Sequence, residues 1–151
     1  MTEPTSAVVR RIMPALPAQV YDEWLDPQSL AEWMCPRPAF ATKIESDARV
    51  GGEYRLDIDD DGLSMTVTGR YLELDRPNRI GFTWHCSNWH PETPGSIVTV
   101  TFEAYGRHET LMTIEHTQLR TDLVERHYNG WLRIAEQLSA ALSPSPRRLI
   151  N

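Results

Sequence analysis

Lysine is nearly absent from this sequence: Lys43 is the only one, and arginine supplies the other basic residues. Fifteen Lys and Arg residues against 21 Asp and Glu leave a formal net charge of −6. An acidic domain without a basic face is a poor electrostatic partner for a phosphate backbone. The sequence therefore predicts no nucleic-acid binding.

Long apolar runs and cysteines are also scarce. No apolar run approaches the roughly 20 residues that span a bilayer, and the N-terminal segment lacks the basic and then apolar pattern of a secretory signal. Cys35 and Cys86 are the only cysteines, and their spacing matches no zinc-binding pattern. We therefore expect a cytoplasmic protein with two free thiols and no membrane insertion.

Motifs that bind metals or phosphates are missing or incomplete. The sequence contains no Gly-rich phosphate loop, no G-x-S-x-G and no HExxH. The run 57–62 imitates the start of a calcium loop, but Thr68 stands where that loop needs a bidentate Glu. In HCSNWH, which contains His85, Cys86 and His90, the first two would point to opposite faces of a strand, and no fourth ligand stands at a standard spacing. The sequence predicts no metal and no cofactor.

Prolines mark two short helices near the N-terminus. After a first strand at 6–13, Pro17 stands at the first turn of a helix at 18–25. Asp26 followed by Pro gives a cap and a first helical residue for a second helix at 27–34. Two more prolines then end that helix.

From Ala39 to Gln118 the apolar residues recur with a period of two, which is typical of half-buried strands. Strands are expected at 40–46, 53–58, 65–71, 80–85, 98–103 and 112–116. Short turns, including Asp61-Gly62, join them, so the segment predicts an antiparallel meander with one apolar face.

A long amphipathic helix at 122–142 would cover that face. Its apolar residues recur in steps of three and four, and it would span roughly 30 Å. Asp122 with Glu125 predicts a capped start. Two prolines follow the helix, and the tail beyond them is expected to fray.

Five segments carry a resemblance to a known family: VYDEWLDPQSLAEWM, RVGGEYRLDI, GRYLELDRPNRIGFTWH, LMTIEHTQL and HYNGWLRIAEQL. In this order they resemble activator of heat-shock-protein-90 ATPase homologues, within the START and Bet v 1-like (SRPBCC) superfamily. The similarity runs from about Ala7 to Leu142. It implies one α+β domain over 1–151 with the helix-grip fold, in which a curved antiparallel sheet wraps around a long C-terminal helix.

The resemblance also implies a cavity between the sheet and the long helix, which superfamily members use for small apolar molecules. Some relatives are cyclases or hydrolases. The eukaryotic chaperone activators carry a separate N-terminal domain, for which this chain has no room.

Aromatic residues are the main candidates for contacts to a ligand. The set expected on or near the concave face is Trp33, Tyr54, Tyr71, Phe82, Trp84, Phe102, Tyr128 and Trp131. Their rings could line a pocket or simply fill the core. Gly130, inside the long helix, could leave cavity space or pack closely on a strand.

Two histidines are expected to face the interior, His116 from the last strand and His127 from the helix. Each could act as a general acid or base, or be a hydrogen-bonded core residue. The leading hypothesis is a binding domain for a small apolar ligand. The alternatives are an enzyme of the cyclase, aromatase or hydrolase type that uses His116 for proton transfer, and a chaperone-regulating module. A homodimer through an edge strand or the convex face is a further expectation.

Overall fold

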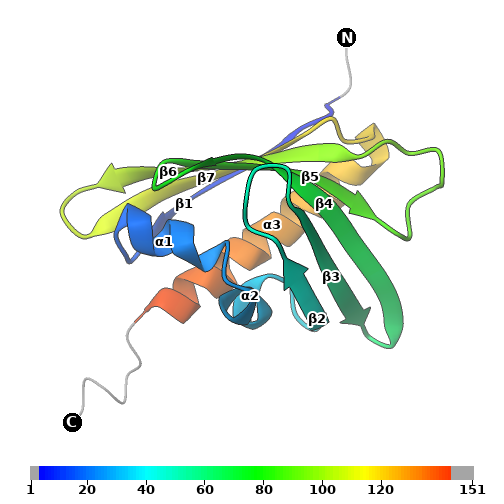
Figure 1. The fold of residues 1–151 in the computed structure, drawn as a ribbon, viewed down its shortest axis with the longest axis horizontal. Coiled ribbons are helices and arrows are strands. Elements are labelled where there is room, and N and C mark those ends of the chain that lie inside the picture. The colour runs from blue at the N-terminus through cyan, green and yellow to red at the C-terminus, as the bar shows by residue number, and fades with distance from the viewer. Residues whose placement is uncertain (1–3, 144–151) are drawn as a thin grey trace.

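The structure, a computed structural model, describes residues 4–143. Seven antiparallel strands form one curved sheet, and three helices lie against its inner side (Figure 1). The elements are β1 (Ala7–Met13), α1 (Pro17–Glu23), α2 (Pro27–Trp33), β2 (Phe40–Ser46), β3 (Glu53–Asp60), β4 (Leu63–Asp75), β5 (Arg79–Cys86), β6 (Ser96–Tyr105), β7 (Glu109–Thr117) and α3 (Thr121–Leu142). This is the predicted helix-grip fold.

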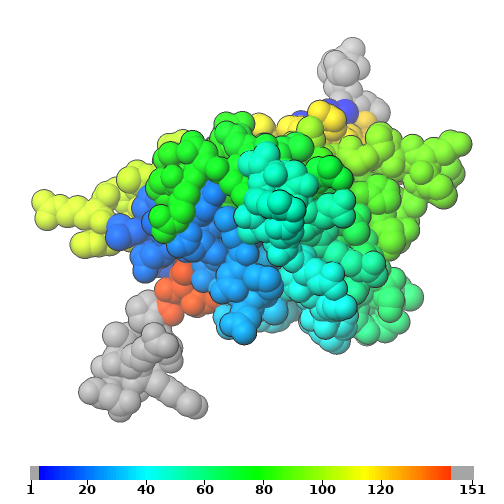
Figure 2. All heavy atoms as spheres, in the orientation of Figure 1, coloured from blue at the N-terminus to red at the C-terminus, as the bar shows by residue number. Residues whose placement is uncertain are grey.

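The sheet runs in the order β1-β7-β6-β5-β4-β3-β2, so the first strand closes one edge beside the last one. In the pairing of β1 with β7, Ala7 lies opposite His116 and Val9 lies opposite Ile114. The predicted meander is confirmed from β2 to β7. The β6–β7 turn and the β5–β6 loop project at opposite ends of the molecule (Figures 1 and 2).

The hairpin between β3 and β4 turns at Asp61 and Gly62, as predicted. Both residues are in the left-handed region, with φ of 55° and 86°. Two such residues in succession are typical of the tight turns that match the twist of paired strands, and Gly and Asp adopt this conformation most readily. The hairpin thus explains this acidic run without calcium.

Helices α1 and α2 both begin with proline, as the sequence predicts. The Asp26 carboxylate accepts a hydrogen bond from the backbone N–H of Gln28 at 3.1 Å and caps α2. The corner between the helices is held by Trp24 and Trp33, whose ring centroids lie 4.9 Å apart.

Helix α3 crosses the inner side of the sheet (Figure 1) and buries Trp131, Ile134 and Leu138 from the predicted apolar stripe. The predicted cap is wrong. Arg120 occupies the cap position without a capping side-chain hydrogen bond. Asp122 lies in the first turn, where its carboxylate accepts two hydrogen bonds from the Arg120 guanidinium, at 3.0 and 2.9 Å.

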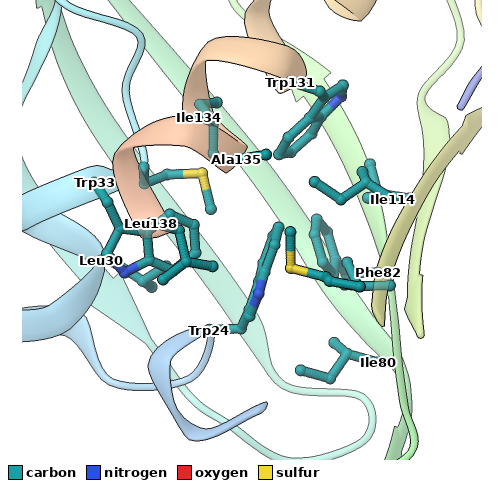
Figure 3. Packing of buried hydrophobic residues seen from close by; sticks show 14 of the residues in the cluster. Trp24, Leu30, Trp33, Ile80, Phe82, Ile114, Trp131, Ile134, Ala135 and Leu138 are labelled. Carbon is teal, nitrogen blue, oxygen red and sulfur yellow. The ribbon is translucent and has the colours of Figure 1, made fainter. Parts of the chain in front are cut away.

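Large aromatic rings fill the interior between α1, α2 and the middle of the sheet (Figure 3). Trp24 stands at the centre, with its ring centroid 6.4 Å from that of Phe82 and 6.1 Å from that of Trp131. The Tyr54 ring lies edge-on to Phe82 at 5.5 Å. This part of the concave face is therefore solid core.

Across residues 4–143, no helix combines the length and the apolarity that crossing a membrane requires. The tail that was expected to fray lies outside the described residues.

Candidate functional site

A cavity of about 430 Å³ lies beyond this aromatic core, between the first half of α3 and the ends of β3, β4 and β5. Its volume is within the range of small-molecule sites in proteins. Four parts of the chain form its wall: the sheet, α3, the α2–β2 loop and the β5–β6 loop.

The sheet wall is apolar because the inward residues of three neighbouring strands line up. Leu56 pairs with Val67, and Val67 pairs with Cys86, so one row crosses β3, β4 and β5. Ile58 and Met65 form the next row toward the β3–β4 turn. Period-two alternation turns all of these side chains to the same face.

The helix wall is one stripe of α3. Leu123, His127, Gly130, Trp131 and Ile134 recur in steps of three and four and line the cavity. A Cβ atom at Gly130 would meet only Pro36 Cγ, at 3.8 Å, within a 4 Å radius. This is ordinary van der Waals contact with a loop residue, and Gly130 lies on the cavity wall, so the alternative of close packing on a strand is wrong.

The α2–β2 loop forms a third wall because Gln137 of α3 holds it in place. The Gln137 side-chain amide donates hydrogen bonds to the carbonyl oxygens of Trp33 at 3.0 Å and Cys35 at 2.8 Å. Its own oxygen accepts a hydrogen bond from the backbone N–H of Arg37 at 3.0 Å. These contacts fix Cys35 and Pro36 beside the cavity.

The β5–β6 loop, residues 87–95, covers the cavity from the fourth side. Its Trp89 ring packs edge-on against His127, with centroids 5.7 Å apart. Thr93 is buried, and its hydroxyl accepts a long hydrogen bond of 3.4 Å from the Arg120 guanidinium. This contact ties the loop to the start of α3.

His116 lies behind the cavity wall and is fully buried. The indole N–H of Trp131 donates to His116 Nδ1 at 3.0 Å, so that nitrogen is an acceptor. Nε2 therefore carries the proton and donates to Ser96 Oγ at 2.6 Å, and the Ser96 hydroxyl donates to the Trp84 carbonyl oxygen at 3.0 Å. Burial and the neighbouring His127 lower the pKa of His116 to about 3. His116 is a neutral residue that orients Trp131.

His127 does line the cavity. Its Nδ1 donates to the Leu123 carbonyl oxygen at 2.9 Å, one helical turn earlier, because that oxygen can only accept. Its ring stands edge-on to His116, with centroids 5.0 Å apart. Burial lowers the pKa of His127, so it too is neutral at pH 7.

Cys35 and Cys86 are buried free thiols, as predicted, and both line the cavity. Burial raises the pKa of each thiol to about 11. The thiolate is the nucleophilic form of cysteine, so neither residue is activated for covalent chemistry at neutral pH.

Three of the expected contact residues lie on the cavity wall: Trp84, His127 and Trp131. Those that lie outside it in the buried core are Trp33, Tyr54, Tyr71, Phe82, Phe102 and His116. Tyr128 is 40% exposed, because it follows His127 by one residue and so points about 100° away around the helix.

Sequence reasoning missed much of the wall. Cys86 could have been found, since it shares a strand face with Trp84 by period two. Trp89 could not, because the loop that carries it has no periodic pattern. Among residues 4–143, no three His, Cys, Asp or Glu side chains are grouped closely enough to hold a metal ion, and this includes His85, Cys86 and His90.

A helix-grip domain with an apolar cavity under its long helix is the class of protein that this geometry defines. The family model described as "Activator of Hsp90 ATPase homolog 1-like protein" matches residues 14–143. The chain belongs to this family. No curated protein matches it.

Solved structures agree with this assignment. Protein CV1439 from Chromobacterium violaceum is 31% identical, with a TM-score of 0.85, and the match covers 94% of this chain and 99% of that one. CalU16 from Micromonospora echinospora is 22% identical, with a TM-score of 0.69 and coverage of 95% and 79%. PFC0360w from Plasmodium falciparum, described as an HSP90 activator, is 22% identical, with a TM-score of 0.74 and coverage of 92% and 96%. The last two show the fold alone.

Proposed function

We propose that this single domain binds a small apolar or aromatic molecule in the cavity between α3 and the sheet. The observation that carries the proposal is the cavity of about 430 Å³ that Gly130 borders. A glycine inside a helix costs up to about 1 kcal/mol relative to alanine, and here the missing side chain leaves a hollow rather than a tight contact.

The composition of the wall supports an apolar guest. Leu56, Val67 and Ile134 supply aliphatic surface, and Trp84 and Trp131 supply broad rings. Small-molecule sites are mostly apolar with a few polar groups that fix orientation. Burying apolar surface contributes about 25 cal/mol per Å², so an apolar ligand gains binding free energy when it enters the cavity.

The test is binding of N-phenyl-1-naphthylamine, a neutral aromatic fluorophore, followed by fluorescence and calorimetry. We expect one saturable site with a dissociation constant on the order of 10 µM. Gly130→Leu should abolish binding, because its side chain would occupy the hollow. Gly130→Ala is the matched control and should keep most of it. Binding that survives Gly130→Leu would place the site elsewhere.

An enzyme of the cyclase or hydrolase type remains a weaker candidate for the same cavity. Both ring nitrogens of His116 are engaged by protein groups, and the residue lies behind the wall. We therefore expect His116→Gln to leave any turnover of a bound substrate largely intact. If His116→Gln loses turnover but still folds and binds the substrate, the enzymatic function would be favoured.

A chaperone-regulating role is the other candidate, and the description of PFC0360w as an HSP90 activator is what favours it. Stimulation of the chaperone's ATPase by this domain alone would favour chaperone regulation over small-molecule binding as the function. The cytoplasm is the compartment we propose, since the two buried thiols stay reduced there. A homodimer through an edge strand or the convex face is a further proposal, and sedimentation velocity tests it, since a monomer at all concentrations would contradict it.

A further inference from the structure

One polar atom on the cavity wall has no partner. The indole Nε1 of Trp84, a residue only 8% exposed, has no nitrogen or oxygen acceptor within residues 4–143, and the weakly accepting thiol of Cys86 is the protein group on which its N–H acts. Trp24 Nε1 also lacks a partner there, but Trp24 lies outside the cavity wall. Burying a donor without an acceptor costs about 1–3 kcal/mol, so buried donors are nearly always paired. A donor left over at a ligand cavity is explained if the ligand supplies the acceptor.

A positive charge interrupts the stripe of α3 that faces the cavity. Arg126 lies on the wall between Leu123 and Gly130, one turn from each. It makes no ion pair within the described residues, and Asp122, one turn earlier, is held by Arg120 instead. The guanidinium is exposed and can therefore turn toward a bound group at the cavity mouth.

These two groups share one neighbourhood, around the sulfur of Cys86. Burial dominates the pKa of Cys86 and raises it, yet the Trp84 N–H and the Arg126 charge both act in the opposite direction. Trp84 and Cys86 also share the inner face of β5. A ligand atom that lies beside Cys86 would thus meet a hydrogen-bond donor and a positive charge together.

The β3 part of the cavity wall, which β4 separates from Cys86 on β5, carries a negative charge. Asp60, at the end of β3, lies on the wall, and its charge adds to the larger effect of burial in raising the pKa of Cys35. It makes no ion pair within residues 4–143 either. Two charges of opposite sign without an ion-pair partner among residues 4–143 thus line the cavity, Arg126 on α3 and Asp60 on β3.

We propose that the ligand is an apolar or aromatic molecule with one anionic group, such as a carboxylate or sulfonate, which lies beside Cys86 and is held by the Trp84 indole N–H and Arg126. This rests on the proposed function, since it names the ligand class of the same cavity. The apolar body of the ligand would fill the space left by Gly130, with its uncharged end toward Asp60.

The test compares two fluorophores with the same aromatic framework. 8-Anilino-1-naphthalenesulfonate carries a sulfonate, and N-phenyl-1-naphthylamine lacks it. We expect the anionic probe to bind at least about tenfold more tightly, the effect of one hydrogen bond to a charged group. Its affinity should fall with added salt, while that of the neutral probe should not.

Four variants locate the anionic group. Trp84→Phe, which keeps an aromatic ring and loses the donor, should weaken the anionic probe about tenfold. Arg126→Met should weaken it about fivefold and remove the salt dependence, and Asp60→Asn should tighten it by a smaller factor. Arg107→Met, in the β6–β7 turn at the far end of the sheet, makes the same charge change and should have no effect.

The outcomes separate the two proposals. Equal binding of both probes, or an unchanged preference in Trp84→Phe and Arg126→Met, would overturn the anionic ligand and leave the apolar site standing. If neither probe binds at one saturable site that Gly130→Leu removes, the binding function itself fails, and this inference falls with it.

Discussion

Lowering the pH from 7 to 5 should destabilise this protein through His116. In the folded state its ring is buried and neutral with a pKa of about 3, whereas in the unfolded chain a histidine titrates near 6.5. Below about pH 6.5 the unfolded state therefore binds a proton that the native state does not. The contribution of neutral His116 to the free energy of unfolding is complete above that pH and decreases as the pH falls. It levels off only near the folded pKa of about 3.

The size of the effect follows from the two pKa values. The limiting slope is about 1.4 kcal/mol per pH unit, so His116 alone should lower the free energy of unfolding by about 2 kcal/mol between pH 7 and pH 5. His127, whose pKa burial also lowers, acts in the same direction. Carboxylates with lowered pKa values, such as Asp22 and Asp57, lose their contribution mainly below pH 5.

Urea unfolding followed by tryptophan fluorescence at pH 7, 6 and 5 measures this loss. His116→Gln keeps a group that can accept from Trp131 and donate to Ser96, but it does not titrate. We expect this variant to be less stable at pH 7 and to lose about 2 kcal/mol less than wild type on acidification. His108→Gln, in the exposed β6–β7 turn, should follow wild type. An unchanged loss in His116→Gln would refute the reasoning.

Three further predictions concern the same fold. Gly69→Ala should lower the free energy of unfolding in urea by about 2 kcal/mol or more, because its Cβ atom would overlap the carbonyl oxygen of Thr83. Gly130→Ala should instead raise it by about 0.5–1 kcal/mol, because alanine favours a helix and its Cβ atom meets no close neighbour. Cys35 and Cys86, each with a pKa raised to about 11, should react with Ellman's reagent at pH 8 only slowly until urea is added, and fast native labelling would contradict their burial. Asp26→Ala should cost about 1 kcal/mol by removing the α2 cap, and an unchanged midpoint would show that the cap contributes nothing.

Much of the fold could be predicted from local patterns. Period-two alternation placed Trp84 on the inner face of its strand, and steps of three and four placed His127 and Trp131 on the inner face of α3. The two short helices followed from Pro17 and from Asp26 before a second proline. These signals are local, and the structure follows them closely.

The position of the cavity along the groove could not be predicted, because it depends on tertiary packing. Tyr54 and Phe82 were expected beside the ligand with Trp84, yet they lie in the solid core because Trp24, at the end of α1, packs against that part of the sheet. No sequence period reveals which half of a curved sheet two short helices will fill. The sequence did not place Arg126 on the cavity wall, because a charged residue is expected to face the solvent unless its neighbours in the fold are known.

The most direct test of the central claim is nuclear magnetic resonance of the five tryptophan indole N–H groups during titration with N-phenyl-1-naphthylamine. Trp84, Trp89 and Trp131 line the cavity, while Trp24 and Trp33 lie outside its wall. The account predicts saturable shifts for the first three and small ones for the other two. Shifts led by Trp24 and Trp33, or no saturable shift at all, would contradict a ligand site under the first half of α3.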